Sequence, residues 1–404
     1  MKRIIVLGTG FAAFSFLKKI NLRLYDVTVI SPRNHFLFTP LLPETTVGTI
    51  EFRSIIEPVR NLKKIFFHQA YCISIDADAK SVTCFDIDTR KTFELKYDML
   101  VIAVGEVTNT YGVEGVELFS MFLKELSDAR KIRTKVIDAF EKASLPDVSE
   151  KQKKKYLTFV VCGGGPTGVE FAAELHDFIE EDIKKKYPEL KNMVGIILIE
   201  AADKILPSFD ARLSEYTMKN FMRNKIITKT QSMITRISND KIFLNDGSEI
   251  DYGLLVWATG NTSTNLVNNL SVNKNNRHKL VTNGHFEVSG CEDIYAIGDC
   301  CEIENHPFPA TAQVAEQEGF YLAKILNKPE KDMKPFSFRN LGMLAYIGGY
   351  RALADMPKFK GSGFTTFLFW RSAYLTKLVS LKNKMLVLFD WFKTLVFGRD
   401  VSSF

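Results

Sequence analysis

A short apolar run, a glycine-rich turn and a helical pattern follow one another twice in this chain, and this repeat constrains the fold most. In the first copy, IIVLGTGFAAFSFL, a strand is predicted at Ile4–Leu7. Gly8, Gly10 and Ala13 then form a G-x-G-x-x-A turn that opens directly into a helical pattern. The first glycine of such a turn permits a sharp bend, and the second lets the backbone approach a pyrophosphate. The stretch therefore predicts a dinucleotide-binding βαβ unit.

The second copy, LTFVVCGGGPTGVEFAAEL, lies 155 residues further along the chain. Its predicted strand, Leu157–Cys162, is followed by Gly163, Gly165 and Gly168. The helix N-terminus after each turn presents backbone N–H groups that favour a phosphate. Two such units in 404 residues predict two Rossmann-like domains.

The residue that ends the second strand of each unit is expected to meet a ribose. In the second unit this residue is Glu200, whose carboxylate can accept bonds from ribose hydroxyls and would repel a 2′-phosphate. Glu200 therefore favours NADH over NADPH, although an ordinary surface glutamate is the alternative. In the first unit the residue is Ser31, followed by Pro32 and Arg33, so the ribose contact there stays open.

Two dinucleotide sites in one chain indicate two cofactors that exchange a hydride, and the usual pair is a flavin and a nicotinamide. Two strand-then-glycine segments, Leu100–Gly105 and Leu254–Gly260, follow the first and second site respectively. Asp299 comes after a third such strand and is expected to accept bonds from the ribityl chain of a flavin. The alternative for Asp299 is a helix N-cap, and the two roles are compatible.

Composition and cysteine spacing exclude several classes of protein. The net charge of +6 and the pI of about 8.8 are too mild for a dedicated nucleic-acid binder. The six cysteines show neither a C-x-x-C pair nor zinc spacing, so we expect reduced, mostly buried thiols and no metal. No signal peptide and no apolar run of 18 residues is visible.

Longer stretches carry a family resemblance that spans about Lys2 to Ser403: NHFLFTPLLPETTVGTIEFRSIIEP, MFLKELSDARKIR, CGGGPTGVEFAAEL, YAIGDC, TAQVAEQEG and LGMLAYIGG. They resemble type II (alternative) NADH:quinone oxidoreductases of the fungal and plant mitochondrial style. The resemblance implies an α/β fold of the glutathione-reductase type, with FAD and NADH as cofactors. It also implies an NADH domain inserted into an FAD domain, followed by a C-terminal amphipathic helical region that anchors the protein to a membrane.

The resemblance assigns roles to individual residues. It implies the following FAD contacts: Gly8, Gly10, Ala13, Ser31, Arg33, Thr39, Pro40, Leu41, Ala103, Gly105, Asp299 and Ala312. It implies the following contacts on the NADH side: Gly163, Gly165, Gly168, Glu200 and Gly260. Glu170 matches a glutamate near the nicotinamide and is expected to be catalytic. Its alternative is a polar residue favoured in the first helical turn by the helix dipole.

The expected domain boundaries follow from the same motifs. They are 1–110 for the first part of the FAD domain, 111–155 for a connector, 156–267 for the NADH domain, 268–327 for the second part of the FAD domain, and 328–404 for the quinone and membrane region.

The electron acceptor is expected to be a small diffusible molecule such as a quinone, because the chain shows no cysteine spacing typical of a disulfide reductase and no haem or iron–sulfur motif. The family resemblance implies ubiquinone. Gln313 and Gln317 lie four residues apart on a predicted helix, Ala312–Leu326, and could donate to a quinone oxygen. Neighbouring Glu316 could assist proton delivery. Their alternative is an ordinary polar helix face. A reductase of a ferredoxin- or rubredoxin-type protein and a flavoprotein like the apoptosis-inducing factors are the alternative functions.

The end of the chain predicts membrane attachment. In a helix over Lys384–Phe397, apolar residues recur at three- and four-residue steps, and Asp390, Lys393 and Thr394 fall on the other side. From Trp370 onwards six basic and two acidic residues give a net charge of +4. This pattern predicts an interfacial helix region over Trp370–Phe397, and a core or dimer helix is the alternative. We expect a homodimer that is peripheral on the mitochondrial inner membrane.

Overall fold

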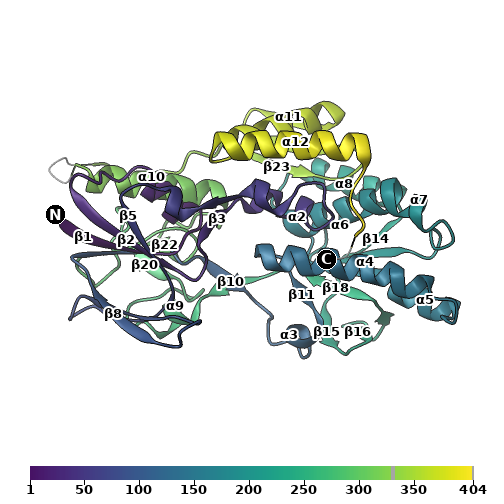
Figure 1. Cartoon of the computed structure of the whole chain (residues 1–404), viewed down its shortest axis with the longest axis horizontal. Coiled ribbons are helices and arrows are strands. Elements are labelled where there is room, and N and C mark those ends of the chain that lie inside the picture. Colours follow the sequence, from purple (N-terminus) through teal and green to yellow (C-terminus); the bar gives the residue numbers. More distant parts are fainter. Residues whose placement is uncertain (329–332, 403–404) are drawn as a thin grey trace. The chain divides into compact units, whose positions relative to one another are not determined.

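The computed structural model describes residues 1–328 and 333–402, which form two compact units (Figure 1). Unit 1 contains Met1–Leu37, Glu57–Val107 and Asn261–Asn340. Unit 2 contains Phe38–Ile56, Thr108–Gly260 and Leu341–Phe404. Each unit is built on its own parallel sheet, so the two Rossmann-like folds predicted from the glycine turns are confirmed.

The core of unit 1 is a five-stranded parallel sheet with the strand order β21-β9-β1-β2-β5. Its strands are β1 (Lys2–Leu7), β2 (Tyr25–Ser31), β5 (Ile65–Gln69), β9 (Met99–Ile102) and β21 (Ile294–Ala296). The buried apolar runs Ile4–Leu7 of β1 and Met99–Ile102 of β9 fit strands that are covered on both faces.

Two helices pack closely beside this sheet: α1 (Phe11–Leu17) and α10 (Ala312–Leu326). A Cβ at Gly319 would lie 2.2 Å from the carbonyl oxygen of Ala12, so only glycine permits this approach of α10 to α1. The observed bounds of α10 are those predicted from the sequence.

Smaller elements complete unit 1. An antiparallel sheet contains β6 (Tyr71–Asp76), β7 (Ser81–Phe85) and β8 (Thr92–Lys96). The other elements are β3 (His35–Leu37), η3 (Val59–Asn61), β19 (Asn261–Ser263), α9 (Asn265–Asn269), β20 (Leu280–Thr282) and β22 (Cys301–Ile303). The chain passes between the units at β4 (Ile56–Pro58) and β10 (Glu106–Thr108).

Unit 2 repeats the architecture with the strand order β11-β18-β12-β13-β14. Its strands are β11 (Met121–Phe122), β12 (Thr158–Cys162), β13 (Gly195–Ile199), β14 (Ile226–Lys229) and β18 (Leu254–Trp257). Its helices up to residue 223 are η1 (Thr39–Leu41), α2 (Leu42–Thr45), η2 (Phe52–Ile55), α3 (Val116–Phe119), α4 (Leu126–Ser144), α5 (Glu150–Tyr156), α6 (Pro166–Phe178), η4 (Ile179–Ile183), α7 (Lys184–Lys186) and α8 (Ala211–Arg223). An antiparallel sheet contains β15 (Ile234–Ile237), β16 (Lys241–Leu244) and β17 (Glu249–Asp251).

The stretch 111–155 is more than a connector. It supplies β11 at the edge of the unit 2 sheet, where Met121 pairs with Val256. It also supplies α4, whose buried face includes Ile132, Val136 and Phe140. The stretch therefore belongs to the core of unit 2, because its apolar helix face is buried there.

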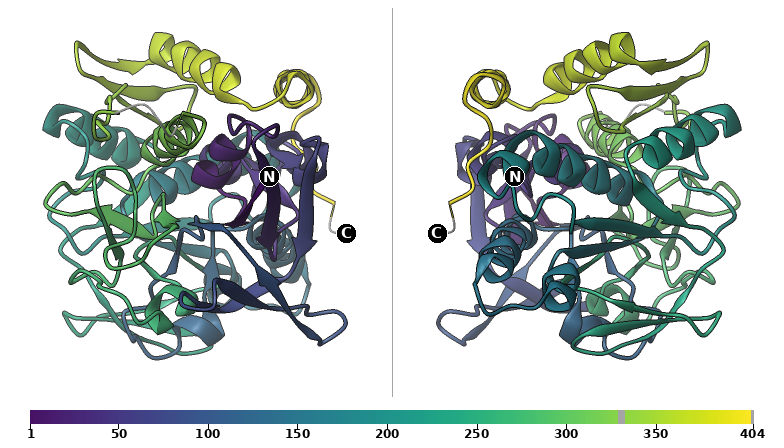
Figure 2. Two further views of the ribbon diagram at one scale, coloured as in Figure 1. Left: turned by 90° about the vertical axis from the view of Figure 1, so that its left-hand side faces the viewer. Right: turned by 90° about the vertical axis from the view of Figure 1, so that its right-hand side faces the viewer.

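The C-terminal region of unit 2 contains an antiparallel sheet and two helices that lie beside one another (Figures 1 and 2). Its elements are β23 (Met343–Tyr346), β24 (Ala352–Met356), β25 (Phe359–Gly363), α11 (Phe364–Lys377) and α12 (Leu381–Phe397). Helix α12 begins three residues before the predicted Lys384, because the Ser380 hydroxyl caps it by accepting from the Asn383 N–H at 3.2 Å.

Helix α12 buries a mixed face, which contains Asn383, Val387, Asp390 and Trp391, and exposes a largely apolar face. Asp390 is 4% exposed and accepts from the backbone N–H of Glu51 at 3.0 Å and from the Ser54 hydroxyl at 2.5 Å. By contrast, a row of large apolar side chains is exposed: Leu381, Met385, Leu388, Phe389, Phe392, Leu395, Val396 and Phe397. Because most of its large apolar side chains are exposed, α12 is not a core helix, and the dimer-helix alternative stays open. Among the helices of residues 1–328 and 333–402, none is long and apolar enough to cross a bilayer.

Candidate functional site

The first glycine turn has the geometry of a phosphate-binding loop. Gly8 has φ of +111°, and a Cβ there would lie 2.2 Å from the carbonyl oxygen of Ala103. Gly10 precedes the first turn of α1, and no atom lies within 4 Å of the position that its Cβ would take. No side chain caps α1, so its N-terminal end is open to an anion.

Side chains at the end of β2 are bonded to one another. The hydroxyl of Ser31 lies 3.2 Å from that of Thr9 and accepts from the Arg33 backbone N–H at 3.2 Å. The Arg33 Nε donates to the Thr9 hydroxyl at 3.5 Å. These bonds fix the loop after β2, and the predicted ribose contacts of Ser31 and Arg33 stay predictions.

A buried carboxyl supports the loop that carries Asp299. Glu318 on α10 is 5% exposed and accepts from the Gly298 backbone N–H at 2.5 Å. Burial raises the pKa of Glu318 to about 7. Glu318 thus positions the residue before Asp299, a role that the sequence analysis missed. The other predicted flavin contacts of unit 1 lie in this unit as well: Ala103 and Gly105 follow β9, and Ala312 begins α10.

The two glutamines of α10 differ in their surroundings. The Gln317 amide nitrogen donates to the Arg339 carbonyl and its oxygen accepts from the Arg339 N–H, both at 3.0 Å. These two bonds favour the structural interpretation of Gln317. Gln313 lies one turn earlier, and Glu316 lies between them; the quinone contacts of these residues remain predictions.

The second glycine turn repeats the first in unit 2. Gly163 has φ of +118°, and a Cβ at Gly168 would lie 2.0 Å from the carbonyl oxygen of Gly163. Gly165 precedes α6 and its missing Cβ faces open space, as at Gly10. The sequence therefore builds the same open helix end twice.

The carboxylate predicted for the ribose lies beside this turn. Glu200 follows β13 and accepts from the backbone N–H of Gly164 at 2.6 Å and of Ala202 at 2.8 Å. Gly260 follows β18, and a Cβ there would lie 2.7 Å from the hydroxyl of Tyr111. The three predicted glycines of the turn and Glu200 thus gather at the carboxyl edge of one sheet.

Glu170 is buried in the second turn of α6, which begins at Pro166 and has no acidic residue in its first turn. It is 6% exposed and accepts from the Tyr346 backbone N–H at 3.1 Å. Burial raises the pKa of Glu170 well above its usual range. The alternative of a polar residue in the first helical turn is therefore wrong, and the nicotinamide contact of Glu170 stays a prediction.

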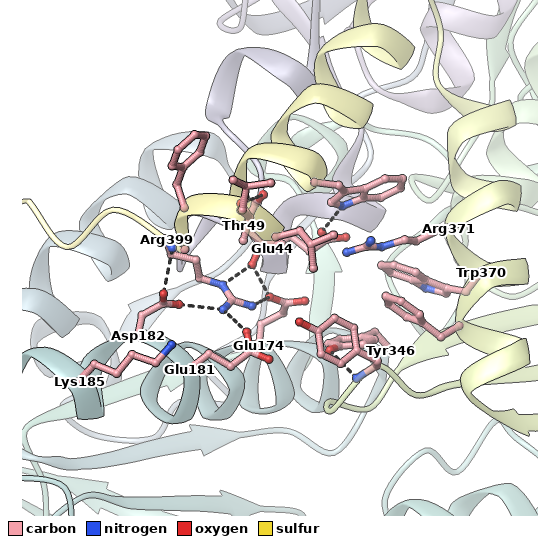
Figure 3. Close-up of a pocket in the computed structure, with 18 of the residues that line it drawn as sticks. Glu44, Thr49, Glu174, Glu181, Asp182, Lys185, Tyr346, Trp370, Arg371 and Arg399 are labelled. Carbon is pink, nitrogen blue, oxygen red and sulfur yellow. Dashed lines mark hydrogen bonds and ion pairs between the residues drawn. The ribbon is translucent and has the colours of Figure 1, made fainter.

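A cavity of about 440 Å³ in unit 2 gathers acids, bases and aromatic rings (Figure 3). Helices α11 and α12, the end of the chain, the loop after α2, and the α6–α7 segment provide its walls. The side chains most relevant to chemistry are Glu44, Glu174, Tyr346, Trp370, Arg371, Trp391 and Arg399. Sequence reasoning missed this cavity, because its residues are far apart in the chain.

Two carboxyl groups of the cavity have pKa values close to neutral pH. Glu44 accepts from the Trp391 indole N–H at 2.8 Å, and its Oε1 has no partner among the described residues. Burial, followed by the nearby charge of Glu174, raises the pKa of Glu44 to about 8. Burial also raises the pKa of Glu174 to about 7, while Arg399 opposes the shift. The only sequence signal was two acids placed within apolar stretches, LLPE and FAAE.

Arg399 connects the end of the chain to this cluster. Its Nη1 lies 3.0 Å from Asp182 and 2.8 Å from Glu181, and its Nε donates to the Thr49 hydroxyl at 2.8 Å. Figure 3 shows its guanidinium among these groups. The ion pairs hold the segment after α12 against the α6–η4 segment.

Removal of the Glu44 charge should flatten the pH dependence of stability. Between pH 4.5, the ordinary glutamate pKa, and about 8, the folded protein binds more protons at Glu44 than the unfolded chain. Stability contributed by neutral Glu44 is therefore lost as pH rises through this window. At high pH, the melting temperature of Glu44→Gln should exceed that of the wild type by about 2–4 °C, which corresponds to roughly 1 kcal/mol of added stability. Melting curves from pH 5 to 8.5 test this, with exposed Glu117→Gln as control; parallel curves for Glu44→Gln and the wild type would refute it.

Comparisons with known proteins match nearly the whole chain. Residues 2–319 fit the family model described as pyridine nucleotide-disulphide oxidoreductase, and residues 340–400 fit that of the NDH2 C-terminal domain. This chain belongs to the type II NADH dehydrogenase (NDH2) family. Because NDH2 proteins share the glutathione-reductase type of fold, the family accounts for the two Rossmann-like units of the structure.

Similar proteins include a probable NADH dehydrogenase of Dictyostelium discoideum, which is 47% identical over 100% of this chain and 91% of its own length. The external NADH-ubiquinone oxidoreductase 2 of Saccharomyces cerevisiae, described as mitochondrial, is 41% identical over 99% of this chain and 82% of its own. The solved structure of NDH2 from Plasmodium falciparum in complex with NADH superposes with a TM-score of 0.96 and 31% identity, covering 99% of both chains.

Proposed function

We propose that this chain is a type II NADH:ubiquinone oxidoreductase that passes electrons from NADH through FAD to ubiquinone without pumping protons. The observation that carries the proposal is the match of the entire chain to NDH2 proteins, including one solved with NADH. The names of the yeast and other relatives supply ubiquinone as the acceptor. Both open glycine turns fit this chemistry, because each offers a helix end to a pyrophosphate.

The residues present fit both cofactors. FAD, when bound, supplies the flavin ring that accepts a hydride and passes on electrons. We propose that Gly8, Gly10 and Asp299 hold it in unit 1, with Glu318 positioning the Asp299 loop. In unit 2, Gly165 and Glu200 would hold the pyrophosphate and ribose of NADH.

The cavity of unit 2 offers polar groups suited to a quinone oxygen. Near neutral pH Glu44 is protonated and can donate a hydrogen bond or a proton. The Trp370 indole N–H is buried in the wall of the cavity, beside the ring of Tyr374. We therefore propose this cavity as a place where the quinone head binds. Gln313 and Gln317 on α10 stay separate candidates for a quinone contact.

The exposed apolar face of α12 supports attachment to a lipid surface. Polar residues fix the other face of the helix to the body, so the apolar face is held outward. Exposed Phe364, Leu368 and Phe369 on α11 add to this surface. Aromatic and aliphatic side chains with nearby lysines are typical of interfacial helices. We propose peripheral binding to the mitochondrial inner membrane through Trp370–Phe397, and a homodimer.

The test of the proposed function is NADH oxidation by the purified, FAD-loaded protein. Short-chain ubiquinone should be reduced rapidly, whereas a ferredoxin, a rubredoxin and a disulfide should be poor acceptors. Rapid turnover with a protein acceptor but not with quinone would favour the alternative, a reductase of a ferredoxin- or rubredoxin-type protein. Slow turnover with every acceptor would favour a flavoprotein like the apoptosis-inducing factors.

Removal of the Glu200 carboxylate should weaken the preference for NADH. The variant Glu200→Ala loses the acceptor for ribose hydroxyls and the charge that repels a 2′-phosphate. We expect the NADH/NADPH ratio of kcat/KM to fall about tenfold or more, which corresponds to about 1.4 kcal/mol. Exposed Glu189→Ala is the control. An unchanged NADH/NADPH ratio for Glu200→Ala would contradict the assignment of Glu200 to the ribose of NADH.

A further inference from the structure

Two cysteines face each other across the consecutive antiparallel strands β6 and β7 of unit 1. Cys72 on β6 and Cys84 on β7 are direct partners in the strand register. Directly opposed residues of an antiparallel pair bring their Cβ atoms to about 4.5–5.5 Å, and a disulfide needs only slightly less. No C-x-x-C spacing could have revealed the pair, because the strands bring it together.

The two thiols already interact. Both cysteines are free, and each thiol shifts the pKa of the other, upward at Cys72 and downward at Cys84. The register is irregular between Cys72 and Ser74, and the Cys72 thiol also lies 3.5 Å from the Ser74 carbonyl oxygen. The pair therefore has close sulfur atoms on a stretch of strand that is not locked into a regular ladder.

The two sulfur atoms differ in access. Cys84 is fully buried, whereas Cys72 is only partly buried. A reagent from solution can reach Cys72 alone, and Cys84 needs to reach only Cys72. An accessible thiol beside a buried second thiol allows the second thiol to resolve a mixed disulfide, while the raised pKa of Cys72 slows the first attack at neutral pH.

We propose that Cys72 and Cys84 form a reversible disulfide with low-molecular-weight disulfides such as oxidised glutathione. The Cys72 thiol first loses its proton to solvent, then attacks one sulfur of the glutathione disulfide, forms a mixed disulfide and releases one glutathione thiolate. The Cys84 thiol, losing its proton, then attacks the Cys72 sulfur and releases the second glutathione. Two protein thiols are oxidised, one glutathione disulfide is reduced to two thiols, and the two protons pass to the leaving thiolates.

The adjacent cysteines Cys300 and Cys301 also lie close to each other, but neither of them is accessible from solution. The Cys300 and Cys301 thiols are buried and point to backbone carbonyls, at 3.4 Å for Ile297 and 3.1 Å for Ala296. Cys162 is buried in the core of unit 2. Disulfides in reducing compartments are usually transient or sensing ones, which fits a pair on a small accessory sheet.

The location of the pair connects it to the first dinucleotide turn. Strand β5 ends at Gln69, which pairs with Ser31, and the next N–H, that of Ala70, donates to the Ser31 carbonyl at 3.2 Å. Cys72 follows two residues later. A disulfide between Cys72 and Cys84 would link the segment that follows β5 to β7. Because the disulfide also closes a loop in the unfolded chain, the oxidised protein should melt at a higher temperature than the reduced protein.

The test equilibrates the full-length, FAD-loaded protein in glutathione buffers of increasing oxidised fraction, followed by acid quenching, alkylation and non-reducing trypsin digestion. Trypsin separates Cys72 from Cys84 at Lys80, so peptides 65–80 and 81–90 remain joined only by the proposed bond. We expect the joined pair to appear with oxidation, to vanish with dithiothreitol and to accompany a rise in melting temperature.

Three variants make the result decisive. Cys72→Ser and Cys84→Ser should each abolish the joined peptides and the melting shift, while Cys291→Ser should retain both. Full alkylation of Cys72 and Cys84 at every ratio would overturn the proposal. Glutathione remaining on Cys72 alone, or linkage of Cys72 to Cys291, would also overturn it. None of these outcomes bears on NADH oxidation, so the proposed function is tested separately.

Discussion

Replacement of Gly168 with alanine is expected to lower the rate of flavin reduction by NADH about 100-fold, the cost of a misplacement of roughly 1 Å in a reacting geometry. The added Cβ would lie 2.0 Å from the Gly163 carbonyl oxygen. Either α6 or the glycine turn must therefore move away, and the open helix end at Gly165 moves with it. Stopped-flow absorbance of the flavin under anaerobic conditions measures this rate.

The matched control for this prediction is Gly195→Ala in β13 of the same unit. A Cβ there meets its nearest atom at 3.9 Å, so the substitution adds a methyl group without a clash. Both variants should retain FAD, because their substitutions lie in unit 2 and outside the first glycine turn. Normal flavin reduction by Gly168→Ala with an unchanged melting temperature would contradict the assigned role of the second turn.

The double variant Phe389→Asp with Phe392→Asp is expected to release the protein from lipid vesicles. Both rings are exposed on α12, at 61% and 62%, so their loss costs the folded body little packing. Removing two phenylalanine side chains from a lipid interface costs about 3–6 kcal/mol, and two new negative charges add repulsion from anionic lipid. The vesicle partition constant measured by co-sedimentation should therefore fall by about 100-fold or more.

Met222→Asp with Ile227→Asp is the matched control, because both side chains are exposed apolar residues of unit 2 outside α11 and α12. This control should sediment with vesicles like the wild type. Equal release of both double variants would show a general charge effect. Unchanged binding of the α12 variant, together with loss of a dimer in solution, would make this face a subunit interface instead.

Local sequence patterns were sufficient for the two nucleotide-binding units. A strand, a turn that needs positive φ at Gly8 and Gly163, and an amphipathic helix are all determined within about twenty residues. The predicted bounds of α10 match for the same reason. Residues 111–155 could not be assigned in this way, because the role of β11 depends on its partner β18, more than 130 residues away.

Features that depend on long-range packing were missed or only half predicted. The pattern of α12 revealed two faces but not which of them meets the body, because hydrophobic periodicity carries no information on the partner surface. The partners are backbone and hydroxyl groups near Ser54 that bind Asp390. Glu44, Glu174 and Arg399 similarly become a cluster only after the chain has folded, and so do Cys72 and Cys84.

The most direct test of the proposed activity is an anaerobic double-mixing experiment. The FAD-loaded protein is first reduced with one equivalent of NADH and then mixed with ubiquinone, while the flavin absorbance and the quinol formed are recorded. The oxidised flavin spectrum should return in full, and one quinol should form per flavin. A flavin that NADH reduces but that stays reduced in the presence of ubiquinone would contradict the proposed activity.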